Sequence, residues 1–283
     1  MAGDLFVETF GRRGRGGRGT AVVLRWIAGA LLAAGLLAMP ALAQDDVNDP
    51  LEPLNRGIFE FNRVLDGLLL EPAARMYRMA TPQFIRTGVR NFLANLTTPV
   101  VFVNDLLQGE PHRAELTLGR FMMNTILGLG GLIDVGGMLG MPERHFEDFG
   151  QTLAVHGVGP GPYLMLPLLG PSNGRDAAGR VVDLGFDPLT VLGAAGVGIF
   201  IEPTTFGLAR TGTQGLSSRE DNLDEVDELK RSSIDLYAAV RSYYLQFRAN
   251  EIRNGAPAPG DDIYDENLYE DPTLEDLDEA PLE

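Results

Sequence analysis

The sequence predicts an all-α fold, and three observations support this prediction. Prolines stand at residues 50, 72, 82, 99 and 111, each close to the start of a segment whose apolar residues recur three or four positions apart. Proline is favoured in the first turn of a helix, and this apolar spacing is typical of an amphipathic helix. Runs that alternate between apolar and polar residues, as half-buried strands do, are rare. We therefore expect a single domain of successive short helices.

Residues 1–43 have the pattern of a cleavable signal peptide. Five arginines, at positions 12, 13, 15, 18 and 25, precede an apolar run from Trp26 to Met39. Ala41-Leu42-Ala43 then forms a small-x-small cleavage site directly before Gln44. The alternative is a membrane anchor that is never cut. We expect export from the cytoplasm and a mature helical domain over residues 44–253.

The first half of this domain divides into helices at its prolines. The first helix is expected to open at Asp49-Pro50, with Asp49 as its N-cap. Its apolar face carries Leu54, Ile58, Phe61 and Leu65. Further helices are expected over residues 71–80, from Pro82 to about Leu96, from Pro99 to Gly109, and from Pro111 onward.

The stretch from Phe121 to Met141 is apolar but broken by glycine. It contains six glycines and one charged residue, Asp134. Each glycine inside a helix costs about 1 kcal/mol relative to alanine, so a continuous membrane-spanning helix is disfavoured. We expect two short apolar helical pieces joined by a bend. This hairpin either packs in a core or meets lipid.

The second half is less regular. Pro162–Leu169 is the best candidate for a strand, although Pro167 interrupts it. Ser172 is expected to cap a helix over 175–184, and a second glycine-broken apolar run covers Leu189–Ile201. Residues 204–221 are expected to be loop and partial helix, and 223–253 to be one amphipathic helix that stops at Asn254-Gly255.

The last segment, residues 254–283, is predicted to be an acidic disordered tail. From Glu251 to the end, 12 acidic residues face one arginine, and apolar residues are few. Such a tail is either a solvated extension or a segment that attracts a basic partner electrostatically.

The composition excludes several kinds of function. The formal net charge is −16 and Lys230 is the only lysine, so nucleic acid is not an expected partner. The chain has no cysteine, which excludes disulfides, zinc–thiolate sites and cysteine nucleophiles. None of the three histidines has the spacing of a metal site, and His145 is expected to be a surface or capping residue. We predict no catalytic residue, metal or cofactor.

One motif is nevertheless typical of an enzyme. Gly170-Pro-Ser172-Asn-Gly174 matches the nucleophile elbow G-x-S-x-G of α/β-hydrolases. That fold needs a histidine after the serine, whereas His112, His145 and His156 all precede Ser172. A soluble periplasmic hydrolase that uses Ser172 therefore stays only an alternative.

Five long stretches together resemble the VacJ/MlaA family of Gram-negative outer-membrane proteins. They are N-D-P-L-E-P-L-N-R-G-I-F-E-F-N (48–62), V-N-D-L-L-Q-G-E-P (103–111), R-F-M-M-N-T-I-L-G-L-G-G-L-I-D-V (120–135), D-F-G-Q-T-L-A-V-H-G-V-G-P-G-P-Y-L-M-L-P-L-L-G-P-S (148–172) and R-D-A-A-G-R-V-V-D (175–183). The resemblance implies a ring-shaped helical protein, partly embedded in the inner leaflet of the outer membrane, with a lipid channel.

The resemblance also implies a function without covalent chemistry. Members of this family remove mislocalised phospholipid from the outer leaflet and pass it to a periplasmic lipid carrier, which maintains lipid asymmetry, and they associate with trimeric porins. Besides the hydrolase, the alternative is a structural envelope interaction protein whose acidic tail recruits partners.

The resemblance further places candidate residues for lipid gating and for the channel. They are Phe61, Asn62, Leu127, Leu129, Leu132, Ile133, Asp134, Met138 and Leu139. The lone charge of Asp134 suits a wet headgroup path better than a dry core. For each apolar residue the alternative is ordinary helix packing.

The chain departs from the family at its N-terminus. Family members usually carry an acylated cysteine after the cleavage site, whereas this chain has Gln44 and no cysteine. We expect a protein on the periplasmic side of the outer membrane that is not a lipoprotein and is held there by its own apolar surface.

Overall fold

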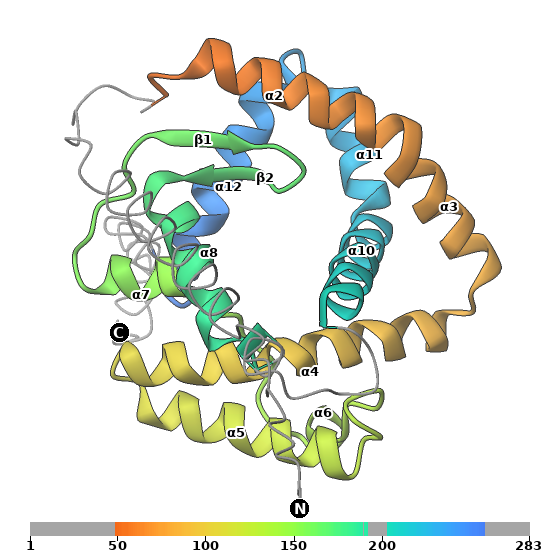
Figure 1. Cartoon of the computed structure of the whole chain (residues 1–283), viewed down its shortest axis with the longest axis vertical. Coiled ribbons are helices and arrows are strands. Elements are labelled where there is room, and N and C mark those ends of the chain that lie inside the picture. The colour runs from red at the N-terminus through yellow and green to blue at the C-terminus, as the bar shows by residue number, and fades with distance from the viewer. Residues whose placement is uncertain (1–48, 189, 192–202, 258–283) are drawn as a thin grey trace, which may run out of the picture.

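The computed structural model describes residues 49–188, 190–191 and 203–257. Its helices follow one another around a ring, with a short β-hairpin on one side (Figure 1). The elements are α2 (Glu52–Leu65), the π-helical turn η1 (Asp66–Leu70), α3 (Glu71–Ala80), α4 (Gln83–Leu107), α5 (Pro111–Ile126), α6 (Val135–Met138), α7 (Phe149–Val155), β1 (Tyr163–Leu166), β2 (Gly170–Asn173), α8 (Gly174–Phe186), α10 (Pro203–Asp221), α11 (Leu223–Ser232) and α12 (Leu236–Ile252). The predicted helical class and ring are thereby confirmed.

Three predicted segments fall mainly outside the described residues. The signal peptide, residues 1–43, lies entirely outside them. So do most of the apolar run at 189–201 and all but the first residues of the tail at 254–283.

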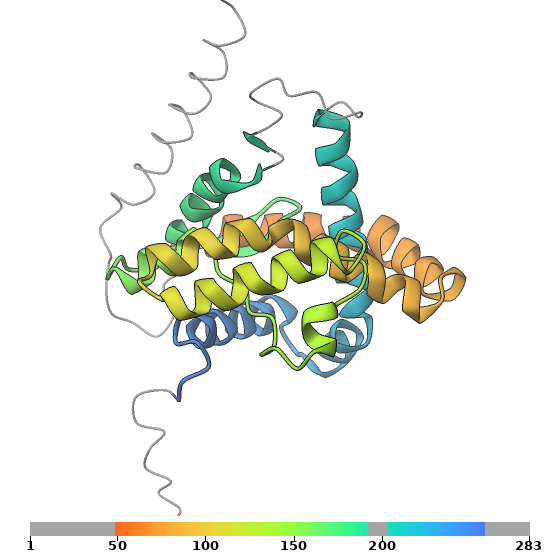
Figure 2. The ribbon, with the colours of Figure 1, turned by 90° about the horizontal axis from the view of Figure 1, so that it is seen from below.

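Helix α4 corrects the prediction of two helices separated at Pro99. It runs unbroken for 25 residues with Pro99 inside it. The hydroxyls of Thr97 and Thr98 both donate to the carbonyl of Ala94, at 2.8 and 3.0 Å, in the turn that the proline disturbs. Helix α5 lies antiparallel along α4 (Figure 2), and this packing keeps the helix continuous despite the missing N–H.

The region after residue 203 also differs from the prediction. Residues 203–221 form one continuous helix, α10, and not a loop with a partial helix. Near its C-terminal end Glu220 is buried and pairs with Arg78, at 3.0 Å, and with Arg86. These contacts join α10 to α3 and α4, and they supply the stability that the weak apolar periodicity of the segment does not indicate.

The predicted single helix over 223–253 is in fact two helices, α11 and α12. The break lies at residues 233–235, where the Asp235 carboxylate accepts a hydrogen bond from the backbone N–H of Ala238 and so caps α12. Asp235 also pairs with Arg56 of α2 at 2.7 Å. Because Asp235 both caps α12 and pairs with Arg56, the chain starts a new helix here and does not continue α11.

The β-hairpin refines the strand prediction. Strand β1 pairs antiparallel with β2, with Tyr163 opposite Asn173 and Leu166 opposite Gly170. Pro167 therefore does not interrupt a strand but begins the turn that follows β1. Asn173, and not Ser172, caps α8, because its side-chain oxygen accepts from the N–H of Asp176 at 2.7 Å.

The core is small and lies where the hairpin meets α12. Tyr163, Met165, Tyr237 and Tyr244 are buried together, and Ile58 and Phe59 of α2 pack against them. The ring of Tyr163 makes edge-on contacts with Tyr237 and Tyr244, with centroids 6.2 and 6.1 Å apart. Helices α7 and α8 meet through Gly150 and Gly179, where a Cβ on Gly179 would lie 2.3 Å from the nitrogen of Gly150.

Candidate functional site

Large apolar side chains are exposed over much of the molecule. One group belongs to α2, η1 and α3, where Met79 is 87% exposed. Its other members are Leu54, Phe61, Val64, Leu68, Leu69, Leu70 and Met76. Gathered exposed apolar side chains of this kind mark contacts with membranes or with other proteins.

A second group covers α5 and the segment that follows it. Leu118, Met122 and Ile126 recur every four residues and form one exposed stripe on α5. The segment that follows α5 adds further exposed apolar residues: Leu127, Leu129, Leu132, Ile133, Met138 and Leu139. These two groups will be called the apolar surface. Within the described part of the chain, no helix has the length and apolar character needed to cross a membrane.

A central cavity of about 1140 Å³ lies between α4, α8, α10 and the segment 143–147. In contrast to the apolar surface, its lining is rich in charge. The charged residues are Arg90, Arg120, Asp134, Glu143, Arg144, Glu147, Arg180, Asp183, Asp187, Arg210 and Asp221. Part of this charge is paired inside the wall, for example Arg210 with Asp187 at 2.9 Å.

Asp134 lies in this wall and organises the short helix α6. Its carboxylate accepts from Arg120 at 2.5 Å, from Asn124 at 2.9 Å and from the N–H of Gly137 at 3.2 Å. Burial raises the pKa of Asp134, but the hydrogen bonds from Asn124, Arg120 and Gly137 outweigh it, so the pKa is lowered. Asp134 is therefore ionised near neutral pH.

Asp183 lies in the same cavity in a different electrostatic state. It accepts from the N–H of Phe149 at 3.0 Å and from Asn104 at 2.9 Å. Burial raises the pKa of Asp183 to about 6, and these hydrogen bonds only partly oppose the shift. These two carboxylates of the wall therefore differ: the pKa of Asp134 is lowered, whereas the pKa of Asp183 is raised to about 6.

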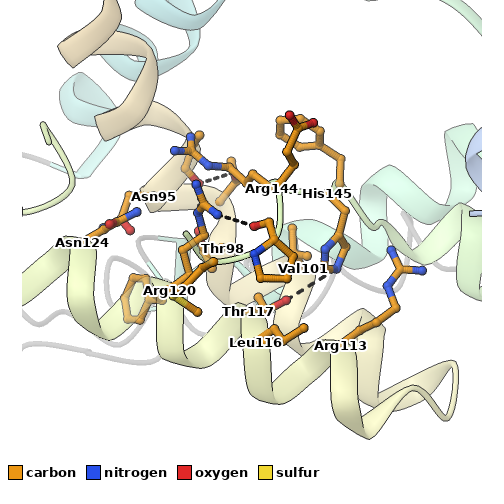
Figure 3. Close-up of a pocket in the computed structure, with 17 residues that line it drawn as sticks. Asn95, Thr98, Val101, Arg113, Leu116, Thr117, Arg120, Asn124, Arg144 and His145 are labelled. Atoms are coloured by element: carbon orange, nitrogen blue, oxygen red, sulfur yellow. Dashed lines mark hydrogen bonds between the residues drawn. The ribbon is translucent and has the colours of Figure 1, made fainter. Parts of the chain in front are cut away.

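A smaller side cavity of about 280 Å³ lies between α4, α5 and the segment 141–146. Its lining combines apolar residues with three arginines and a histidine, and Figure 3 shows Arg120 and Arg144 next to each other on one side of it. The positively charged and titratable residues are Arg113, Arg120, Arg144 and His145. Arg120 and Arg144 also line the central cavity, so the two cavities share a wall.

Beside the side cavity, Asp105, His145 and Glu147 bring three possible metal ligands within 4.8 Å of one another. Their atoms already have partners in the protein. Asp105 accepts from Thr117 at 2.7 Å and lies 2.9 Å from His145, while Glu147 accepts from Arg113 and Gln108, both at 2.8 Å. A metal would have to displace Arg113, so this set acts as an internal polar network. His145 is half-buried in that network and is not the surface or capping histidine that was predicted.

Of the predicted gating pair, Asn62 has a defined contact. Its amide nitrogen donates to the carbonyl of Leu166 and its amide oxygen accepts from the N–H of Leu168, both at 2.9 Å. Asn55, earlier in α2, holds β1 in the same manner. Its amide nitrogen donates to the carbonyl of Tyr163, and its amide oxygen accepts from the N–H of Met165. Phe61 is 55% exposed and belongs to the apolar surface.

Among the remaining candidates, Asp134 lines the central cavity. Leu127, Leu129, Leu132, Ile133, Met138 and Leu139 are exposed beside it and belong to the apolar surface. The alternative nucleophile Ser172 is fully buried in β2, and its hydroxyl donates to the carbonyl of Asn173 at 3.4 Å.

Sequence reasoning missed the arginines of the cavity walls. Arg120 and Arg144 are 24 positions apart in a chain with many arginines, and nothing in their local pattern distinguishes them. The one available signal was the scarcity of lysine, since arginine is the cation preferred for partly buried ion pairs.

Comparison with known proteins identifies the family. The family model described as MlaA lipoprotein matches residues 47–251. The chain belongs to the MlaA lipoprotein family. An intermembrane phospholipid transport system lipoprotein MlaA from Escherichia coli K12 is 40% identical over 215 residues, which cover 75% of this chain and 81% of the relative.

Other relatives extend the family match. The MlaA lipoprotein of Haemophilus influenzae is 35% identical over 211 residues, which cover 72% of this chain and 80% of that protein. An uncharacterised protein of Rickettsia felis is 36% identical over 209 residues, which cover 74% of this chain and 79% of that protein.

The fold also matches a solved structure, from work on the structural basis for maintenance of bacterial outer membrane lipid asymmetry. The TM-score is 0.63 at 37% sequence identity, and the match covers 72% of this chain and 98% of the other. The chain thus shares the fold of this solved structure.

Proposed function

We propose that this MlaA-family chain is the outer-membrane component of a retrograde phospholipid transport system. It removes mislocalised phospholipid from the outer leaflet and so maintains lipid asymmetry. The observation that carries this proposal is a charged cavity of about 1140 Å³ inside a helical ring whose α5–α6 side is apolar and exposed. A phospholipid needs both environments, one for its headgroup and one for its acyl chains. Such a role requires no covalent chemistry from the chain.

The relatives support the same function. Proteins named as intermembrane phospholipid transport lipoproteins are 35–40% identical over most of the described domain. The matched structure comes from work on outer membrane lipid asymmetry.

Membrane residence is proposed to depend on the apolar surface. Burial of one large apolar side chain contributes about 1.5–3 kcal/mol, so the many exposed residues of the apolar surface together can hold the ring in one leaflet. Because the 283 residues contain no cysteine, no acyl chain can be attached to one. We propose an outer-membrane protein on the periplasmic side that is exported through cleavage after residue 43 and is not a lipoprotein.

The nine predicted residues are proposed to act along this route. Asp134 contributes to the headgroup path, and the exposed leucines, isoleucine and methionine of residues 127–139 contact acyl chains. Phe61 and Asn62 are proposed to affect gating, Asn62 through the hairpin that it holds. A periplasmic lipid carrier and a trimeric porin are the proposed protein partners, and the acidic tail is proposed to stay disordered.

Complementation tests the transport function. The chain would be expressed in an Escherichia coli strain that lacks its own MlaA, and phospholipid in the outer leaflet would be measured by surface labelling. We expect restored asymmetry and phospholipid co-purifying with the mature protein by mass spectrometry. Normal abundance in the membrane without either effect would refute the proposal.

Vesicle flotation tests the membrane attachment. The double variant Met138→Glu/Leu139→Glu places two charges in the apolar surface, whereas Gln246→Glu/Asn250→Asp adds two charges to exposed polar positions of α12. We expect only the first variant to lose flotation with phospholipid vesicles. Equal flotation of both variants would show that the segment at 127–139 is not the attachment surface.

A further inference from the structure

Arg144 stands in the wall that the two cavities share, and its charge is poorly compensated. Its side chain is 23% exposed, and its nearest acceptors are Asn91 at 3.4 Å and Asp134 at 3.5 Å. Both distances exceed those of a good charge-assisted hydrogen bond. A guanidinium that is largely removed from water without a close carboxylate carries a free-energy cost.

The nearest carboxylate is already engaged. The Asp134 oxygen that faces Arg144 accepts from Arg120 at 2.5 Å, so two arginines share one carboxylate. Burial lowers the pKa of Arg144, Asp134 opposes this, and the positive charge of Arg120 lowers the pKa further. Nε of Arg120 is buried and has no hydrogen-bond partner among the described residues. Because Arg120 and Arg144 share one carboxylate, this corner of the side cavity has an excess of positive charge.

The remainder of the side cavity is amphipathic. Thr98, Thr117, Asn95 and Asn124 contribute polar groups, and Leu116, Phe121 and Met141 contribute apolar surface. The acidic residue in the lining is Glu143, which is exposed and lines the central cavity as well. At the far end Arg113 is paired with Glu147 at 2.8 Å, so its charge is already compensated.

We propose that the side cavity binds the phosphodiester group of a phospholipid, with Arg144 as its principal contact and Arg120 beside it. This inference rests on the proposed function and adds a location to it. The planar donor fork of arginine matches phosphate oxygens, and a bound anion supplies the compensation that Arg144 lacks. The apolar lining favours a glycerol diester over free phosphate. Val101 and Phe146 line both cavities, so a headgroup can pass between the side cavity and the central cavity at this shared wall.

Site-specific photo-crosslinking of the full-length mature protein tests the location. One probe replaces Leu116, which lines the side cavity, and another replaces Gln214, which lines the central cavity. Each protein is irradiated with vesicles of phosphatidylethanolamine and phosphatidylglycerol, and lipid adducts are quantified by mass spectrometry. We expect an adduct at Leu116 that falls roughly ten-fold with Arg144→Gln, the loss that corresponds to one charge-assisted contact.

Two variants control for charge and folding. Arg231→Gln removes an exposed arginine of α11 that lines neither cavity, and it should leave the Leu116 adduct unchanged. Arg144→Lys keeps the charge without the donor fork and should give an intermediate adduct. Circular dichroism verifies the fold of each variant. With Arg144 unchanged, the comparison of the lipid adduct at Leu116 with the adduct at Gln214 tests where the phospholipid binds.

The outcomes separate this inference from the proposed function. An adduct at Gln214 but none at Leu116 overturns the side-cavity site and leaves phospholipid transport standing, whereas no adduct at either position contradicts both. Equal loss with Arg144→Gln and Arg231→Gln overturns the specific role of Arg144. Complete displacement of the adduct by low millimolar inorganic phosphate assigns the site to free phosphate and overturns the lipid assignment.

Discussion

Arg120 and Asp134 form a 2.5 Å ion pair that joins the long helix α5 to the four-residue helix α6. The neighbouring Asn124 strengthens the same connection, because it donates to Asp134 and accepts from the N–H of Gly136, both at 2.9 Å. A helix of one turn has almost no stability of its own. The position of α6, and with it that of Asp134 in the wall of the central cavity, therefore depends on these polar contacts.

Replacement of Asp134 by asparagine should loosen this wall. The variant leaves Arg120 and Arg144 without their shared carboxylate, and we expect the free energy of unfolding to fall by about 1.5–3 kcal/mol, the range for hydrogen bonds to charged groups. Denaturant unfolding followed by circular dichroism measures the change.

The pH dependence of this difference follows from the lowered pKa of Asp134. A carboxylate whose pKa is lower in the folded state stabilises the fold above its unfolded value of 3.8, and this stabilisation is lost as the pH falls through the folded pKa. The difference between wild type and Asp134→Asn should thus be constant near neutral pH and vanish in acid. A difference that persists in acid would show that the charge of Asp134 is not responsible.

Gly137→Ala should disturb the same ion pair from the other side. A Cβ at residue 137 would lie 2.6 Å from Asp134 Oδ2 and 3.0 Å from Arg120 Nη2, so one of the two side chains must move. We expect impaired lipid asymmetry, read as greater detergent sensitivity of cells, at normal protein abundance.

Gly212→Ala provides the matched control for this variant. Gly212 lies inside α10 with open space around its Cβ position, so alanine there should only improve helix propensity, by up to about 1 kcal/mol. If Gly137→Ala cells resist detergent as well as Gly212→Ala cells do, the Arg120–Asp134 pair does not control transport.

Asn62 should affect function through the hairpin turn. Leu168, which it holds, has a φ of 66°, a conformation that a side chain as large as leucine rarely adopts without support. Asn62→Ala should cost about 1–3 kcal/mol, because it removes two hydrogen bonds to the backbone. Hydrogen exchange at the Leu168 amide should accelerate accordingly.

Asn62→Asp separates the two contacts of this side chain. Aspartate can still accept from the N–H of Leu168 but cannot donate to the carbonyl of Leu166. We expect protection of the Leu168 amide to be retained in Asn62→Asp and lost in Asn62→Ala. Equal exchange in both variants would show that the contact with Leu168 does not hold the turn.

Local sequence pattern was sufficient for the helical class and insufficient for several boundaries. Pro72 and Pro111 start helices as predicted, because the first helical turn needs no N–H from them. Pro99 has the same local signature, yet the hydroxyls of Thr97 and Thr98 and the packing of α5 keep α4 continuous. That outcome depends on a partner helix, which no local pattern contains.

For the candidate site, too, local sequence pattern predicted only some of the residues. Asp134 was identifiable from sequence because a single charge in an apolar stretch is conspicuous. Its partners Arg120 and Arg144 were not identified, since they come from α5 and from the segment after α6 and meet only in the folded chain. Asn62 was singled out through the family resemblance, whereas its contact with the hairpin, 106 residues away, required the structure.

Asp183 should give the protein a measurable pH response. Its pKa is raised from 3.8 to about 6, so between these values the folded chain holds a proton that the unfolded chain has released. Asp183 therefore contributes stability that is fully present below pH 3.8 and is lost as the pH rises through about 6. Wild type should gain about 1–3 kcal/mol relative to Asp183→Asn when the pH is lowered across this window. Denaturation midpoints of both proteins at several pH values measure the effect, and parallel pH profiles would contradict the raised pKa of Asp183.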